Sequence, residues 1–277
     1  GDHGPQGYKG GVGARGEAAV AGTAKLWRDI WRRSVVSTAL VVLRYSNGQS
    51  PQDFVTSGTG FIGQTNIIVT NGHVVESLID TDASDPNNAV HQLVRIMIWF
   101  PQSVAGDTRA DARPADVELS IGSVVDRSIA TTDDIALIQA ATGTRPSLTL
   151  SPRSEAADSL TGSTGVVLGE EVLMLGYSTG TTFPHFTVGD INAVQATKGS
   201  DPWAGLLSNQ KIVYEYDLIS GGGSSGGPVL DLKGEVIGIN FAGFTEAADV
   251  EFGYCVQTKH LRALLDQPRA WQSLGGN

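Results

Sequence analysis

Gly221-Gly222-Gly223-Ser224-Ser225-Gly226-Gly227-Pro228 is the stretch on which the interpretation of this chain depends. Glycines let a backbone turn tightly and point consecutive N–H groups into one concavity, with no Cβ to obstruct an incoming carbonyl group. A serine in such a turn becomes a nucleophile when a base removes its proton and donors stabilise the resulting oxyanion. A flexible Gly/Ser linker is the alternative interpretation, but strand-like runs at 212–216 and 228–230 flank the stretch. A nucleophilic turn requires a base and an acid elsewhere in the chain.

The composition is that of a globular protein large enough to bury a substantial core, with 277 residues of which 40% are hydrophobic. The formal net charge of -10 disfavours a nucleic-acid binder and a protein held electrostatically on an anionic membrane. A single cysteine, Cys255, excludes an intramolecular disulfide and a Cys-based structural zinc site. No apolar run is long enough to cross a bilayer. We therefore expect no nucleic-acid partner and no membrane insertion.

Glycine occupies every third position from Gly1 to Gly16, which is the spacing of a collagen-like repeat. Six triplets with a single proline are too few to hold a triple helix unaided, so we expect residues 1–24 to form a disordered Gly-rich leader. The end of a longer repeat tract is the alternative. The next segment predicts a short helix that packs on the body of the protein or on a neighbouring subunit, because one helical face carries Leu26, Trp27, Ile30 and Trp31.

From Ser34 onward, short β-rich runs alternate with clusters of Gly, Pro, Asn and Asp, a pattern typical of antiparallel strands. A segment at 140–165, rich in Thr, Ser, Gly and Pro, separates two such sets and is the expected domain junction. We expect an all-β protein in which residues 25–145 hold the N-terminal helix and a first β unit. Residues 146–277 would hold a second unit and a closing helix that ends before Pro268. The expected strands are 35–45, 54–62, 67–70, 93–100, 117–125 and 135–139, then 171–177, 187–195, 211–217, 228–231, 235–241 and 251–256.

Histidine is the side chain whose unperturbed pKa suits a general base near neutral pH. Of the five histidines, His73 stands directly after a strand-like run and before a short helical turn, where its ring can be held in place. A hydrogen-bonded structural histidine is the alternative. An acid must fix the tautomer of the base, and Asp133 and Asp134 lie at the mouth of the strand that begins near Ile135. Extended backbone would point the two carboxylates to opposite sides, so that one faces the histidine and the other is a solvated loop carboxylate.

Three short motifs occur in the chain order His, Asp, Ser: Thr-Asn-Gly-His-Val-Val at 70–75, Asp-Ile-Ala-Leu at 134–137 and Gly-Ser-Ser-Gly-Gly-Pro at 223–228. Together they resemble the trypsin-like, chymotrypsin-fold serine peptidases, and most closely the HtrA/Deg branch. The resemblance implies two packed six-stranded antiparallel β-barrels with the catalytic groups in the cleft between them. It covers roughly residues 34–260, with further matches at 57–62, 176–177, 187–191 and 234–240.

Carried over residue by residue, the resemblance assigns Ser225 as the nucleophile, His73 as the general base and then acid, and Asp134 as the orienting carboxylate. It implies an oxyanion hole formed by the backbone N–H groups of Gly223 and Ser225. It also implies that the floor of the pocket for the residue at the cleaved position lies near Ile219. An apolar floor disfavours a buried Lys or Arg cation, so we expect small or aliphatic side chains there. The wall of the pocket is expected along Ile239, Asn240, Phe241, Ala242 and Gly243.

Two departures from the family pattern change what we expect of the nucleophile turn. Ser224 stands where digestive trypsin-like enzymes carry an aspartate that pairs with a freed N-terminus, so activation by N-terminal insertion is not expected. Residues 221–224 replace the Asn-Pro-Gly-Asn of the HtrA pattern, and such a glycine run can leave the oxyanion turn mobile in a resting enzyme. The sequence after the second β unit is also too short for the PDZ module that usually follows in that branch.

The leading hypothesis is a serine endopeptidase that cleaves protein or peptide substrates through an acyl-enzyme, without metal or cofactor. A catalytically silent trypsin-like pseudoprotease that acts as a binding or chaperone-like module is the alternative, and a glutamyl-specific or viral-type relative is a third hypothesis. The resemblance also implies an extracytoplasmic or secreted location. It further implies a homotrimer with contacts through Trp27 and Trp31, for which intramolecular packing of these tryptophans is the alternative.

Overall fold

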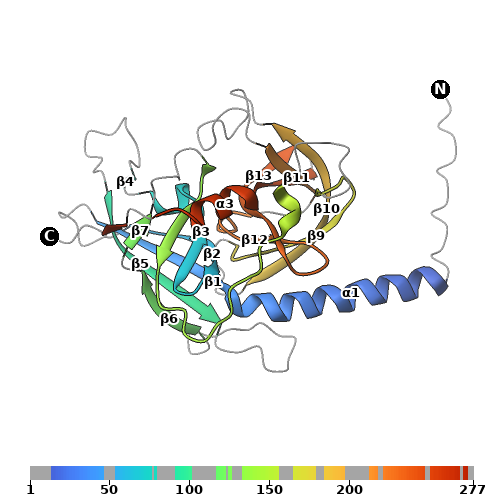
Figure 1. Ribbon diagram of the computed structural model, residues 1–277, viewed down its shortest axis with the longest axis horizontal. Helices are drawn as coiled ribbons and strands as arrows, with labels where there is room; N and C mark the ends of the chain where they lie inside the picture. Colours follow the sequence, from blue (N-terminus) through green and yellow to red (C-terminus); the bar gives the residue numbers. More distant parts are fainter. Residues whose placement is uncertain are drawn as a thin grey trace.

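The structure is a computed structural model, and it places two β units side by side with a long helix running past them (Figure 1). It describes residues 14–46, 54–76, 78–79, 91–101, 117–122, 124–126, 133–155, 165–178, 184–196, 212–217, 221–246, 250–268 and 271–273.

The chain enters the described part through helix α1 (Ala14–Ser34), drawn in blue in Figure 1. The helix occupies residues 14–24 of the segment that we expected to be a disordered leader, so that expectation was wrong for these residues; residues 1–13 lie outside the described part. The physical reason is composition, because the glycine period ends at Gly16 and the alanines that follow, between Ala18 and Ala24, have the highest helix propensity.

The tryptophans of α1 pack within their own chain. Trp27 and Trp31 are only 4% and 7% exposed, and the Trp27 indole N–H donates to the carboxylate of Glu171 in the second β unit. The ring of Trp31 lies with its centroid 6.0 Å from that of Phe186. Trp27 and Trp31 therefore pack as the intramolecular alternative describes, and the trimer that the resemblance implied stays a prediction.

The first β unit is a sheet with the strand order β15-β7-β8-β3-β2-β1-β5-β4, in which β6 also pairs with β5. The successive strands β6 and β7 pair with β5 and β8 respectively, so together they connect the two sides of the sheet. The core of this unit includes Val41, Ile68 and Ile98, all fully buried. The strands are β1 (Thr38–Ser46), β2 (Phe54–Gln64), β3 (Ile67–Thr70), β4 (Leu78–Ile79), β5 (His91–Pro101), β6 (Val117–Gly122), β7 (Val124–Asp126), β8 (Ala136–Gln139) and β15 (Gln272–Ser273).

The second β unit is a closed antiparallel barrel with the order β10-β11-β14-β13-β12-β9. Its core includes Met174, Tyr214 and Cys255. Cys255 is fully buried, and burial raises the pKa of its thiol. The strands are β9 (Glu171–Gly176), β10 (His185–Ala196), β11 (Ile212–Tyr216), β12 (Pro228–Leu230), β13 (Val236–Glu246) and β14 (Val250–Gln257).

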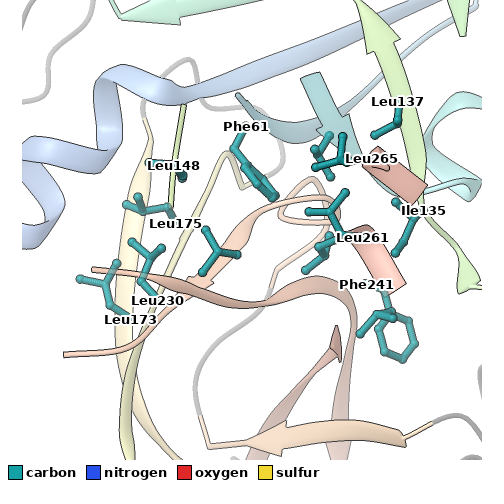
Figure 2. Packing of buried hydrophobic residues seen from close by; sticks show 14 of the residues in the cluster. Phe61, Ile135, Leu137, Leu148, Leu173, Leu175, Leu230, Phe241, Leu261 and Leu265 are labelled. Atoms are coloured by element: carbon teal, nitrogen blue, oxygen red, sulfur yellow. The ribbon is translucent and has the colours of Figure 1, made fainter. Parts of the chain in front are cut away.

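A third hydrophobic cluster lies between the two units and joins them (Figure 2). Helix α3 (Thr258–Leu265) contributes Leu261 and Leu265 to it, and α1 contributes Ile30. Because this cluster mixes residues of both sheets and both helices, the two units share a core. From the first unit come Phe61, Ile135 and Leu137, and from the second Leu173, Leu175, Leu230 and Phe241.

The segment that connects the two units, around residues 148–155, packs against the second barrel. Leu150 forms a parallel bridge with Val236, and Arg153 in the short helix η4 (Pro152–Glu155) donates to Glu170 at 2.7 Å and to Asp231 at 3.3 Å. At the other end of the chain, β15 pairs with β7 of the first sheet. The last strand therefore lies in the first sheet, although we had placed all of residues 146–277 in the second unit.

Two further short helices lie in the described part of the chain, η1 (Val35–Ser37) and η2 (His73–Val75). Within the residues that the structure describes, no helix is both long enough and apolar enough to span a membrane.

Candidate active site

His73 begins η2, directly beyond the end of β3. Strand β3 pairs with β8 so that Thr70 stands opposite Ala136. The residues that follow β3 and those that precede β8 therefore meet at the same edge of the sheet, where Gly72 N–H donates to the Asp134 carbonyl at 3.1 Å. This strand register is what brings His73 against Asp134.

Asp134 holds His73 through both of its carboxylate oxygens. The backbone N–H of His73 donates to Oδ1 at 2.8 Å, and the ring Nδ1 lies 2.8 Å from Oδ2. Asp134 itself has φ +50°, a left-handed conformation that aspartate tolerates better than most residues, and Asn71 Nδ2 donates to its carbonyl at 2.9 Å. An ionised carboxylate only accepts hydrogen bonds, so this contact places the ring proton on Nδ1 and leaves a lone pair on Nε2.

The surroundings of the Asp134 carboxyl group shift its pKa in two opposite directions. Its side chain is only 2% exposed, and this burial raises the pKa of the carboxyl group because the charged form loses its water. The hydrogen bond from His73 and the charge of its ring lower the pKa, but burial is the larger effect.

The neighbouring Asp133 faces a different histidine. Its Oδ1 lies 3.6 Å from Nδ1 of His260, which α3 brings to the strand mouth. Asp133 is only 8% exposed, so our expectation that the second carboxylate is a solvated loop residue was wrong. Sequence reasoning did not find the Asp133–His260 pair, because nothing local to either residue signals that α3 packs over this edge.

The stretch 221–228 forms two consecutive hydrogen-bonded turns and is not a linker. Ser224 N–H donates to Gly221 O at 3.1 Å, and Gly227 N–H donates to Ser224 O at 3.0 Å. Gly223 and Gly226 have φ +91° and +89°, so both turns use conformations that favour glycine. Gly226 N–H donates to Asn240 O at 2.8 Å, which ties the turn to β13.

Strand β2 brings the serine turn and the histidine loop together. Thr59 N–H donates to Ser225 O at 2.8 Å, and the Thr59 carbonyl accepts from Thr70 Oγ1 at 2.7 Å, three residues before His73. A Cβ on the adjacent Gly58 would lie 2.7 Å from Val74 and 3.3 Å from Ser225 O. The serine turn and the strand that leads to His73 thus both contact Thr59 of β2.

The hydroxyl of Ser225 donates to the Phe241 carbonyl at 3.4 Å, a weak contact because O–H donors usually lie within about 3.0 Å of their acceptors. The backbone N–H groups of Gly223 and Ser225 donate to no acceptor in the part of the chain that the structure describes. Among the described residues, no acceptor therefore competes for these two N–H groups.

Three of the five residues expected to form the pocket wall are buried. Ile239, Asn240 and Phe241 are 0%, 1% and 2% exposed, and Asn240 Oδ1 accepts a hydrogen bond from the Tyr216 hydroxyl. Within this group Ala242 and Gly243 reach solvent, and the assignment of residues 239–243 to a pocket wall stays a prediction. Ile219, the expected floor, lies outside the described residues.

No group of three or more His, Cys, Asp or Glu side chains in the described ranges is arranged to hold a metal ion. The chemistry that this arrangement offers is that of a hydroxyl nucleophile, an imidazole and a carboxylate.

A family model of the trypsin-like peptidase domain matches residues 58–239, a range that contains His73, Asp134 and Ser225. No curated protein sequence matches the chain.

Among solved structures, the fold is similar to that of the Rv3671c protease from M. tuberculosis in its active form, with 21% identity, a TM-score of 0.61 and coverage of 91% of this chain and 89% of that one. Deg5 gives 17% identity, a TM-score of 0.55 and coverage of 87% and 92%. The HtrA-type protease AlgW with tripeptide gives 19%, 0.58, and coverage of 86% of this chain and 62% of that one. At these identities the likeness establishes the fold, which is the double barrel that the three motifs predicted.

Proposed function

The chain belongs to the trypsin-like peptidase family, and from this premise we propose that it hydrolyses peptide bonds with a triad of Ser225, His73 and Asp134. The observation that carries the proposal is the double hydrogen bond between Asp134 and His73, formed next to a glycine turn that presents Ser225. The substrates are proteins or peptides.

In the proposed reaction, Ser225 Oγ attacks the carbonyl carbon of the scissile bond while His73 Nε2 takes the hydroxyl proton. The same nitrogen then gives that proton to the leaving amine, which leaves an ester on Ser225. Water, deprotonated by His73, attacks the ester, and the acid product leaves as Ser225 regains its proton. Asp134 keeps the Nδ1–H tautomer and stabilises the imidazolium in both steps.

The oxyanion formed in each step carries its charge on the former carbonyl oxygen. The N–H groups of Gly223 and Ser225 are proposed to receive it, and their lack of other acceptors among the described residues supports that role. Each donor of this kind contributes on the order of 3 kcal/mol to transition-state stabilisation when it is preorganised.

Ser225 must leave the Phe241 carbonyl before it can react. Its hydroxyl bond there is long, and a rotation about χ1 to another staggered rotamer redirects Oγ without moving the backbone. We propose that substrate binding selects the rotamer that donates to His73 Nε2.

The substrate preference rests on the sequence alone. An apolar Ile219 near the pocket floor favours small or aliphatic residues at the cleaved position, because a Lys or Arg cation would lose its water without gaining a carboxylate. Cleavage-site profiling on a denatured proteome measures this directly. Cuts mainly after Arg or Lys would contradict the assignment, and cuts mainly after Glu would favour the glutamyl-specific alternative.

A fluorophosphonate probe with mass spectrometry tests the proposed nucleophile. We expect the label on Ser225 in the wild type and no label in Ser225→Ala. Ser224→Ala is the matched control, since the Ser224 side chain is 1% exposed with its hydroxyl inside the protein, and it should keep the label on Ser225. An unlabelled wild type would favour the pseudoprotease alternative.

A further inference from the structure

Thr59 lies in the middle of β2, in the first β unit, and is fully buried against the nucleophile turn of the second. Its side-chain hydroxyl donates to the Gly223 carbonyl at 2.7 Å and accepts from the Tyr177 backbone N–H at 2.9 Å. Its backbone N–H donates to the Ser225 carbonyl at 2.8 Å. One residue therefore holds a carbonyl group on each side of Ser224.

These contacts fix peptide planes. The plane between Gly223 and Ser224 is held at its carbonyl by the Thr59 hydroxyl and at its N–H by Gly221 O. The plane between Ser225 and Gly226 is held at its carbonyl by Thr59 N–H and at its N–H by Asn240 O. The Ser225 N–H belongs to the plane between these two, so its direction is set by its fixed neighbours.

Glycine makes this restraint necessary. Residues 221–223 carry no Cβ, and without outside contacts the run can adopt many conformations of similar energy. The peptide plane that carries the Gly223 N–H is separated from the plane that the Thr59 hydroxyl holds by two rotatable bonds, φ and ψ of Gly223, and φ is +91° there.

We infer that Thr59 is a positioning residue that holds the turn of Gly223 and Ser225 in the conformation that receives the oxyanion. This inference rests on the proposed function. Because Thr59 belongs to the first β unit and the turn to the second, docking of the two units is what prepares the oxyanion site.

Two substitutions separate the hydroxyl from the shape of the side chain. Thr59→Val keeps the branched shape but removes the donor to Gly223 O and the acceptor for Tyr177 N–H, whereas Thr59→Ser keeps both. Thr38→Val is the matched control, since Thr38 is also fully buried in a strand and its hydroxyl donates to a backbone carbonyl, that of Ser34 at 3.1 Å. Thermal unfolding of all three variants measures the shared cost of losing a buried hydrogen bond.

The discriminating readouts are kcat and KM on a peptide substrate, and the hydrogen exchange of the segment 221–228 by mass spectrometry. For Thr59→Val we expect kcat to fall by about 10- to 100-fold with KM changed by less than about threefold, because the lost restraint acts on the transition state. Hydrogen exchange at the Ser224 and Gly226 amides should accelerate about tenfold or more. Thr59→Ser and Thr38→Val should stay near the wild type in both readouts.

A Thr59→Val variant with wild-type kcat and wild-type exchange in the turn overturns the inference, and so does a Thr59→Ser variant as impaired as Thr59→Val. If the wild type cleaves no peptide and takes no fluorophosphonate label, the proposed function fails, and the hydrogen-exchange arm still decides whether Thr59 holds the turn.

Discussion

At the scale of single residues, a buried carboxylate that orients a histidine carries an electrostatic cost. Asp134 is 1% exposed and its pKa is raised by burial, so the folded protein holds its proton more tightly than the unfolded chain does. Stability from this group is therefore lost as pH rises above the unfolded pKa of about 3.9. Asp134 therefore orients the ring of His73, but its buried charge lowers the stability of the folded protein above that pH.

The substitution Asp134→Asn tests both sides of this balance. Activity should fall by roughly 10⁴-fold, because an amide does not hold the Nδ1–H tautomer of His73. The difference in free energy of unfolding, variant minus wild type, should rise between about pH 4 and pH 7, since only the wild type buries a charge in that range. Urea unfolding at several pH values measures this, and a difference that falls with pH contradicts the cause we assign.

At the scale of elements, the backbone of the nucleophile turn at 221–228 packs closely against the backbone of strand β2. A Cβ on Gly226 would lie 2.0 Å from the Thr59 carbonyl oxygen and 2.3 Å from Thr70 Oγ1, and φ is +89°. Gly169 has a similar φ of +76° but nothing within 4 Å of the Cβ position. Substituting each glycine by alanine therefore separates the cost of a left-handed backbone conformation, which both positions share, from the cost of a steric clash, which only Gly226 has.

We expect Gly169→Ala to cost about 1–2 kcal/mol, the cost of a left-handed alanine, and Gly226→Ala to cost about 4 kcal/mol or more because backbone must also move. Urea unfolding measures both. Similar values for the two variants would show that β2 and the turn are not in the close contact described.

At the scale of the whole molecule, the cluster between the β units makes them one cooperative body. Leu261 on α3 is fully buried in this cluster together with residues of both sheets (Figure 2). The site residues come from both units, so the active geometry depends on the same packing.

Leu261→Ala should lower the free energy of unfolding by about 3 kcal/mol through the lost transfer energy and the cavity. Calorimetry should still show one transition with equal calorimetric and van't Hoff enthalpies. Leu26→Ala, at a position 39% exposed on α1, is the control and should change stability by less than about 0.5 kcal/mol. Two separate transitions would contradict the shared core.

Features that a few neighbouring residues encode could be predicted from the sequence. Alternating apolar residues predicted most strands, and glycines in positive φ are what close the turn at 221–228. The motifs around His73, Asp134 and Ser225 indicated the family before any coordinates, because each motif is continuous in the chain.

Contacts between residues far apart in the chain could not be predicted from the sequence and depend on the packing of the folded protein. The partner of Asp133 is His260, the hydroxyl that holds Gly223 belongs to Thr59, and the last strand joins the first sheet. The fold also buries Ile239, Asn240 and Phe241. Local propensity carries no information on such contacts, because they form only when strand register and the packing of α3 bring separate segments together.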